Sequence, residues 1–229
     1  MNIVLVPGAC HGAWWYAPVV APLEAAGHAA LAVTLPGLCE RADEAGATLT
    51  SHIADLAETV AALEGPVVLV GHSYGGMVIA GVADELSEKV VGLLSVDGFA
   101  PRDGDSCWSS VDDAMRAWYV DASGRSGIGV DPMPQFDART TPHPLASLVQ
   151  RITLTGAYRG ARHYALAADP AWTPHSPFPA IADRLRADPA WTVHDLPTTH
   201  NVLRDGPDAL VGVVTSVVTS VVAEVDEAG

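Results

Sequence analysis

The chain has 229 residues, enough to bury one large core, so we expect a single domain spanning residues 1–229. Apolar residues make up 49% of the sequence and charged residues only 17%, which excludes a disordered chain. Acidic residues outnumber basic ones by 27 to 12, and the formal charge of -15 argues against nucleic acid and membrane surfaces as partners.

The N-terminal apolar run, residues 2–6, has no basic flank and is too short for a signal peptide or a membrane span. The cysteines show no C-x-x-C spacing, which indicates reduced thiols and argues against a zinc site. We therefore expect a cytoplasmic protein. Cys10 lies beside His11 and could act as a thiol nucleophile, but a small buried cysteine is the commoner case.

Short β-branched runs alternate with helical patterns along the chain, which is typical of a parallel sheet with helices on both faces. Ser51 is the candidate N-cap of a helix whose apolar residues, from Ile53 to Leu63, are three or four apart. The segment from Leu210 to Val225 is rich in valine, but its apolar period of about 3.6 residues predicts a helix that begins near Pro207. The predicted strands are residues 2–6, 29–35, 66–71, 90–96, 162–167 and 191–196.

Residues 98–160 interrupt this alternation between the fourth and fifth predicted strands. They combine aromatic residues and methionines with many glycines, prolines and aspartates. An insertion at this point could fold over the carboxyl edge of the sheet, where ligands bind in such folds. We expect a small inserted cap here, and a loop excursion that fills the core is the alternative.

The sequence VGHSYGGM, residues 70–77, lies between a predicted strand and a predicted helix. In that context the pattern G-x-S-x-G forms a nucleophile elbow, a strained turn that exposes its serine. Gly71 and Gly75 lack the side chains that would clash in this turn, and Gly76 lets the helix pack closely. The helix N-terminus favours negative charge developing in front of Ser73, which is therefore the candidate nucleophile.

A serine hydroxyl needs a base to take its proton. His200 lies in the sequence LPTTHNVLRDGP after the last predicted strand, at the carboxyl edge where Ser73 also emerges, and is the candidate base. The third member should be a carboxylate at the carboxyl end of a strand. Asp97 follows the fourth predicted strand and Asp169 the fifth, and either gives the chain order serine, acid, histidine. Position alone does not choose between them.

With these features in order, the chain resembles the α/β-hydrolase superfamily, and more narrowly the branch of plant methylesterases, hydroxynitrile lyases and their bacterial esterase relatives. The resemblance implies an α/β-hydrolase fold: a mostly parallel central sheet, helices on both faces and a small inserted cap. Four stretches carry it: LVPGACHGAWWYAPVVAPLEAAGH (5–28), VVLVGHSYGGMVIAGVAD (67–84), VDGFAPRDG (96–104) and LPTTHNVL (196–203).

In that family the first stretch supplies part of the oxyanion hole. Carried onto this sequence, the resemblance implies the backbone N–H groups of Ala9 and Tyr74 as its donors. The usual His-Gly at the start of this loop reads Pro7-Gly8 here, and a backbone donor survives that change. Many plant members use the later aspartate, whereas bacterial relatives often show D-A-F-x-P where this chain has DGFAP. The resemblance thus favours Asp97 over Asp169 and leaves both open.

We expect a serine hydrolase that cleaves a carboxylic ester of a small apolar or aromatic substrate through an acyl-enzyme intermediate, without cofactor or metal. A thioesterase or a lactonase of a biosynthetic pathway would use the same machinery. Hydroxynitrile lyase chemistry is less favoured, because Gly8 and Asn201 stand where such lyases place a threonine and a lysine. A non-catalytic ligand-binding protein is the alternative from another class. The expected partner is a small-molecule ester, and a homodimer is compatible with the sequence.

Overall fold

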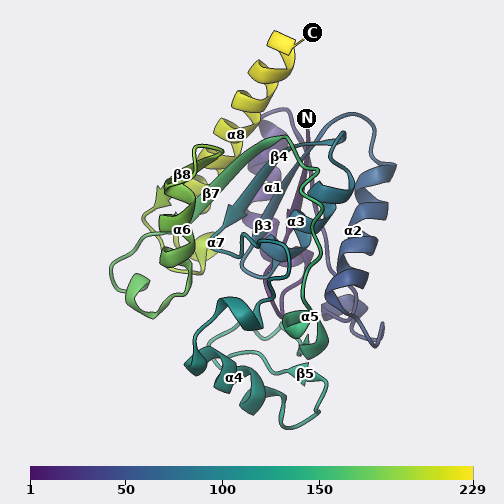
Figure 1. Cartoon of the computed structure of the whole chain (residues 1–229), viewed down its shortest axis with the longest axis vertical. Coiled ribbons are helices and arrows are strands. Elements are labelled where there is room, and N and C mark those ends of the chain that lie inside the picture. The colour runs from purple at the N-terminus through teal and green to yellow at the C-terminus, as the bar shows by residue number, and fades with distance from the viewer. Residues whose placement is uncertain (229) are drawn as a thin grey trace.

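The protein is built around one six-stranded parallel sheet with the strand order β2-β1-β3-β4-β7-β8 (Figure 1). The computed structural model describes residues 1–228, so Gly229, the last residue of the predicted domain, lies outside the described residues. The parallel α/β architecture is confirmed. The six strands are β1 (Asn2–Val6), β2 (Ala29–Ala32), β3 (Val67–His72), β4 (Val90–Val96), β7 (Ala161–Ala167) and β8 (Trp191–Leu196).

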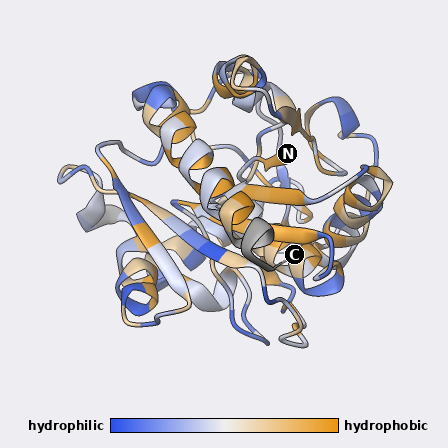
Figure 2. Cartoon of the chain, turned by 90° about the horizontal axis from the view of Figure 1, so that it is seen from above, coloured by the Kyte–Doolittle hydropathy of each residue, from blue (hydrophilic) through white to orange (hydrophobic). Residues whose placement is uncertain are grey.

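Helices cover both faces of this sheet, and the strands alternate between two cores. In β3, Leu69 faces the core formed with α2, α3 and α6, whereas Val68 and Val70 face the core formed with α1 and α8. Figure 2 shows the hydrophobic strands enclosed between these helices. The helices are α1 (Ala17–Ala25), α2 (Leu49–Ala62), α3 (Gly75–Glu85), α6 (Phe178–Arg186), α7 (Val202–Asp205) and α8 (Pro207–Ala228).

Two local expectations need correction. The N-cap of α2 is Thr48 and not Ser51: Thr48 Oγ1 accepts from Ser51 N at 3.2 Å, and Ser51 Oγ accepts from Thr48 N at 2.8 Å. Ser51 is therefore the third helical residue of a capping box. Strand β2 ends at Ala32, three residues before the predicted end, because the following Thr34 turns away to accept from Ala13 N.

The C-terminal helix α8 begins at Pro207, so the helical period outweighed the strand propensity of valine. Its buried face includes Leu210, Val214, Val217 and Val221. No helix in the described part of the chain is long and apolar enough to cross a membrane.

Residues 98–160 contain two helices, α4 (Asp113–Ser123) and α5 (Leu145–Val149), and a short antiparallel pair, β5 (Gly129–Val130) and β6 (His143–Pro144). Figure 1 shows this segment at one end of the sheet. It is joined there to the loop that follows β1, because Thr141 N donates to Cys10 O at 3.1 Å. The insertion thus lies at the carboxyl edge. Short 3₁₀ helices occur at Ala13–Tyr16, Cys39–Arg41, Trp108–Ser110 and Thr173–His175.

Candidate active site

Ser73 lies at a sharp turn between β3 and α3. Its φ of 52° is in the left-handed region, which non-glycine residues adopt rarely. A Cβ on Gly75 would lie 2.5 Å from Val6 O, and a Cβ on Gly71 would lie 2.6 Å from Gly75 O. Neither position can therefore carry a side chain without moving backbone. The turn has the geometry of a nucleophile elbow, and Ser73 remains half-buried at its tip.

His200 follows β8 and faces the carboxylate of Asp97, which follows β4. The distance from His200 Nδ1 to Asp97 Oδ2 is 2.6 Å. Asp97 is fully buried and has a φ of 36°, so a second strained residue lies directly beside Ser73. Because a carboxylate can only accept, Nδ1 carries the proton and Nε2 of a neutral ring is free to act as a base.

Two further donors fix the Asp97 carboxylate. Trp172 Nε1 donates to Oδ2 at 3.1 Å, and Ala167 N donates to Oδ1 at 3.1 Å. Asp169, the alternative acid, is engaged elsewhere: its Oδ1 accepts from Ala171 N at 2.7 Å and so closes a local turn. Asp97 is thus the aspartate that contacts His200.

The ring of His200 is held by other rings on several sides. It stacks with Trp172 and Phe178, at centroid distances of 5.2 and 5.4 Å. His72 packs against it at 4.4 Å, and His72 Nε2 donates to the carbonyl oxygen of His200 at 2.9 Å. Burial lowers the pKa of His72 well below its usual value, so this ring is a neutral donor. His72, directly before Ser73, thereby anchors the loop that contains His200.

The loop after β1 passes against Ser73. A Cβ on Gly8 would lie 2.9 Å from the Cβ of Ser73, so the adjoining Ala9 peptide is close to the nucleophile. His11 Nδ1 donates to Ala9 O at 2.7 Å and orients the peptide between Ala9 and Cys10. Neither Ala9 N nor Tyr74 N has a hydrogen-bond partner among the residues that the structure describes. Tyr74 also lies at the N-terminus of α3, where N–H groups favour negative charge.

Residues 3–223 match the alpha/beta hydrolase family. The chain belongs to this family. A carbendazim hydrolyzing esterase from Nocardioides sp. (strain SG-4G) is 33% identical, over 91% of this chain and 96% of that protein. Esterase PIR7B of Oryza sativa subsp. japonica is 36% identical, over 60% of this chain and 58% of that protein. Plant methylesterases and a hydroxynitrile lyase of Arabidopsis thaliana match over shorter stretches, as the resemblance predicted.

Among solved structures, an extracellular alpha/beta-hydrolase from a Paenibacillus species superimposes with a TM-score of 0.81. It covers 95% of this hydrolase and 98% of its own chain, at 16% sequence identity. This second comparison supports the fold alone. The esterases among the sequence relatives support ester hydrolysis as the general activity.

A buried histidine of the insertion supports the loop after β1. His143, from the insertion, is fully buried, and its Nδ1 accepts from Cys10 N at 3.3 Å. Cys10 has a φ of 69°, so this bond holds a strained residue directly after Ala9. With Nδ1 accepting, Nε2 carries the proton and donates to Ser147 Oγ at 2.9 Å. Burial lowers the pKa of His143 well below its usual value.

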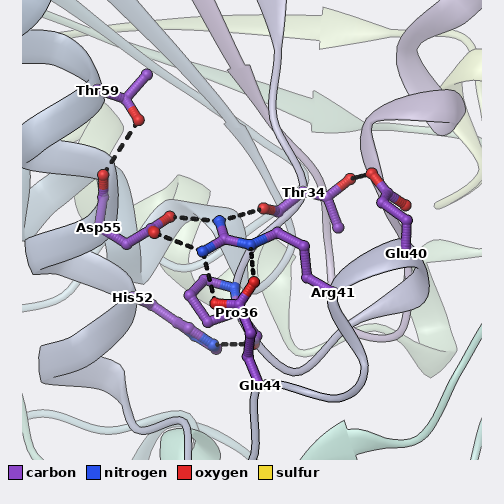
Figure 3. Close-up of polar contacts among 8 residues, drawn as sticks. All are labelled: Thr34, Pro36, Glu40, Arg41, Glu44, His52, Asp55 and Thr59. Atoms are coloured by element: carbon purple, nitrogen blue, oxygen red, sulfur yellow. Dashed lines mark hydrogen bonds and ion pairs between the residues drawn. The ribbon is translucent and has the colours of Figure 1, made fainter.

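A second buried histidine, His52 of α2, supports Tyr74, the residue directly after Ser73. Its Nε2 donates to Pro36 O at 2.9 Å, as Figure 3 shows, so its Nδ1 must accept from the hydroxyl of Tyr74 at 2.7 Å. Arg41 stabilises the loop that contains Pro36, because its guanidinium donates to Thr34 O and to both carboxylate oxygens of Asp55. The ring centroids of Tyr74 and His143 are 4.5 Å apart, so His52 and His143 both contact Tyr74.

Cys10 does not have the environment of a reactive thiol. It is 1% exposed, and burial raises the pKa of its thiol to about 12, so it is protonated near neutral pH. The interpretation as a small buried cysteine is the one that this environment favours. No group of three or more histidine, cysteine or acidic side chains within the described residues is placed to hold a metal ion.

The sequence indicates His143 at most as a residue that lines a pocket, and it does not reveal three other side chains that touch this site: Ser147, Trp172 and Phe178. His143 is flanked by Pro142 and Pro144 in a segment without periodicity, so no pattern marks it as buried. Trp172 follows Asp169 in an apparent turn, and only the register of β7 beside β4 brings its indole to Asp97. A search for polar residues in otherwise irregular insertions would have raised His143.

Proposed function

We propose that this chain is a serine carboxylic-ester hydrolase with Ser73 as nucleophile, His200 as base and Asp97 as acid. The observation that carries the proposal is the contact of 2.6 Å between His200 Nδ1 and Asp97 Oδ2, beside a serine held at a φ of 52°. The orientation of the imidazole and its neutral tautomer both follow from that contact. The hydroxyl of Ser73 has no partner among the described residues, and its bond to His200 Nε2 forms when substrate is bound.

The reaction proceeds in two halves. His200 Nε2 takes the proton of Ser73 as Oγ attacks the ester carbonyl, and a tetrahedral intermediate forms. His200 then gives that proton to the leaving alkoxide, so the alcohol departs and an acyl-serine remains. A water molecule, deprotonated by His200, attacks the acyl group, and the acid is released as Ser73 regains its proton. Asp97 stays ionised and stabilises the imidazolium in each half.

The backbone N–H groups of Ala9 and Tyr74 hold the oxygen that becomes negative. Both are unpartnered among the described residues, and each is supported by neutral buried groups behind it. Losing one such donor typically lowers the rate about 100- to 1000-fold. His143 is a positioning residue in this scheme, because it holds the peptide that follows Ala9.

The substrate we propose is a small ester with an apolar or aromatic part. Aromatic side chains surround the site: the rings of Trp172 and Phe178 lie on His200, and Phe136 packs on His11 at 5.0 Å. Several relatives are named methylesterases. A methyl ester of an aromatic acid is therefore the first natural-type substrate to test, because its alcohol is small and its acyl part suits these rings.

Lyase chemistry of the hydroxynitrile type is disfavoured by the loop of the base. Asn201 stands directly after His200, and its Oδ1 caps α7 by accepting from Arg204 N at 3.2 Å. The Asn201 side chain is neutral and therefore supplies no positive charge to stabilise a departing cyanide. Lys89, the only lysine in the sequence, donates to Ala61 O and Leu63 O instead.

The test combines labelling with turnover. Purified protein is treated with a serine-directed fluorophosphonate, digested and mapped by mass spectrometry, and hydrolysis of p-nitrophenyl acetate is followed in parallel. We expect an adduct on Ser73, full loss of turnover after labelling, and neither adduct nor turnover in Ser73→Ala. A folded protein that neither gains the adduct nor cleaves the ester is a binding protein, and the proposal is then wrong.

A further inference from the structure

A cavity of about 370 Å³ lies between α3, α6 and the adjoining part of the sheet. Neither Ser73, Asp97 nor His200 is among the described residues that line it. Its volume is within the range of small-molecule sites. The polar and aromatic side chains around it are Asp84, Ser95, Arg102, Tyr158, Arg162, Arg184, Asp188 and Trp191.

Three of the arginines without an ion pair line this cavity. Basic residues are scarce, 12 against 27 acidic ones, and six arginines form ion pairs: Arg41, Arg116, Arg125, Arg139, Arg186 and Arg204. Within the described residues the other five arginines form none, and three of these, Arg102, Arg162 and Arg184, line the cavity. Asp84 and Asp188 also line the cavity, but in the described chain neither forms an ion pair with these arginines, so three guanidinium groups without an ion pair at one cavity indicate a place for another anion.

Arg184 carries the clearest sign of an unmet charge. It projects from α6 and is half-buried, and its one hydrogen bond within the described chain is from Nη2 to Ala100 O at 2.5 Å. Burial and the nearby charge of Arg102 lower the pKa of Arg184, although the charges of Asp105 and Asp188 act in the opposite direction. Asp84, also at the cavity, is already occupied by donors from Thr155 and Ala157. A bound anion would stabilise the Arg184 guanidinium in this position.

Ser95 supplies an independent observation. It is 1% exposed, and its Oγ has no hydrogen-bond partner among the described residues. Along β4, Leu94 and Val96 face the opposite core, so Ser95 shares the cavity face with Leu93. A buried hydroxyl is normally paired, and an unpaired one in a cavity wall indicates that a ligand atom completes it.

We propose that this cavity binds a small organic carboxylate, with the acid group on Arg184 and Arg102 and its apolar body beside Ser95. Leu93, Leu154 and Trp191 provide the apolar wall that favours an aromatic or aliphatic body over inorganic phosphate. The guanidinium groups accept a carboxylate in a bidentate geometry. The proposal does not depend on the esterase assignment, because the cavity lacks the triad residues.

Titration calorimetry with sodium benzoate, at constant ionic strength set by chloride, measures this binding on the full chain. We expect one saturable site, and binding weakened at least tenfold in Arg184→Gln and severalfold in Arg102→Gln. The exposed position of Arg102 makes the second variant safe for folding. Benzamide, a neutral molecule of the same shape, should bind at least tenfold more weakly than benzoate.

The matched control is Arg186→Gln. Arg186 lies on the same helix but is paired with Asp183 and Asp195, so benzoate binding should be unchanged in this variant. Equal affinity in the wild-type protein, Arg184→Gln and Arg102→Gln would overturn the proposal, since it would place benzoate elsewhere, including beside Ser73. Absence of a saturable site, or benzamide binding as tightly as benzoate, would overturn it as well.

Discussion

The two flanks of Ser73 use histidine in opposite ways. On one flank His200 keeps 26% of its side chain exposed and faces the carboxylate of Asp97. On the other flank His143 and His52 are fully buried, face a peptide N–H, a carbonyl and hydroxyl groups, and have lowered pKa values because of burial. The contacts of a histidine therefore decide whether it can move a proton or acts as a fixed pair of donor and acceptor.

The two flanks also come from different parts of the chain. The Asp97 flank is built from the ends of β4 and β8 and from Trp172, close to the sheet. The His143 flank is built from the insertion, the loop after β1 and α2. Substitutions can therefore separate the proton-transfer role from the positioning role.

The largest effect should come from the acid. Asp97→Asn should lower kcat/KM about 10⁴-fold, because the imidazole loses its carboxylate and the favoured tautomer changes. Asp169→Asn should change kcat/KM less than about threefold, since Asp169 closes a local turn and does not touch His200. Steady-state kinetics on p-nitrophenyl acetate measures both.

Circular dichroism serves as the control for Asp97→Asn, because Asp97 is fully buried and also accepts from Ala167 N. The assignment of the acid would be wrong if a folded Asp97→Asn retained activity while Asp169→Asn lost it. That result would assign the role of the acid to Asp169, in the loop after β7.

The next largest effect should come from the opposite flank. His143→Gln keeps a donor near Ser147 but removes the acceptor of Cys10 N, so the strained Cys10 peptide and the adjoining Ala9 N–H should shift. We expect kcat to fall about 10- to 100-fold with little change in KM, less than the loss of a whole oxyanion donor. Kinetics on p-nitrophenyl acetate measures the two constants separately.

His143→Asn is the matched variant, because Asn Oδ1 takes the place of Nδ1 and can still accept from Cys10 N. It should retain most of the activity while losing the bond to Ser147. Similar kcat values for the Asn and Gln variants would mean that His143 acts only through general packing, and the positioning role would be lost.

A smaller effect is expected from the side chain of Tyr74. Tyr74→Phe removes the hydroxyl that donates to His52 Nδ1 and leaves a buried acceptor unpaired, which should lower the free energy of unfolding by about 1–3 kcal/mol. The backbone N–H of Tyr74 is unchanged, so kcat/KM should stay within about threefold. Urea unfolding and kinetics on the same samples test this division. A large loss of kcat with unchanged stability would contradict it.

The same flanks show how far sequence reasoning reached. The elbow and the loop of the base lie at the ends of regular strands, where hydrophobic runs and the G-x-S-x-G pattern mark positions directly. The choice between Asp97 and Asp169 could not be made in that way, because both follow neighbouring strands. It depends on a single side-chain contact across 103 positions of sequence.

The His143 flank was out of reach for a different reason. Its contacts join β6, the loop after β1 and α2, and neither period nor propensity describes contacts between irregular segments. The capping box of α2 shows the same limit on a smaller scale. Thr48 and Ser51 both suit an N-cap, and only the side-chain directions decide which one has that role.

The smallest effect concerns pH and tests whether buried histidines outside the site are also held neutral. Burial, and then the neighbouring His194, lower the pKa of His163 in β7 to about 4. The unfolded chain therefore binds more protons than the folded one between about pH 6.5 and 4, so this group's stabilisation is complete above pH 6.5 and declines as the pH falls.

Substitution His163→Gln should flatten the fall in unfolding free energy by at most about 1.4 kcal/mol per pH unit, and by less where solvent screens the site. Urea unfolding at pH 7, 6 and 5 measures the slope, and Asp195→Asn, which alters a surface ion pair with Arg186, is the control whose slope should stay close to that of the wild-type protein. An unchanged slope in His163→Gln would mean that His163 takes up its proton in the folded state, as an exposed histidine does, and that burial in the sheet does not suffice to keep a histidine neutral.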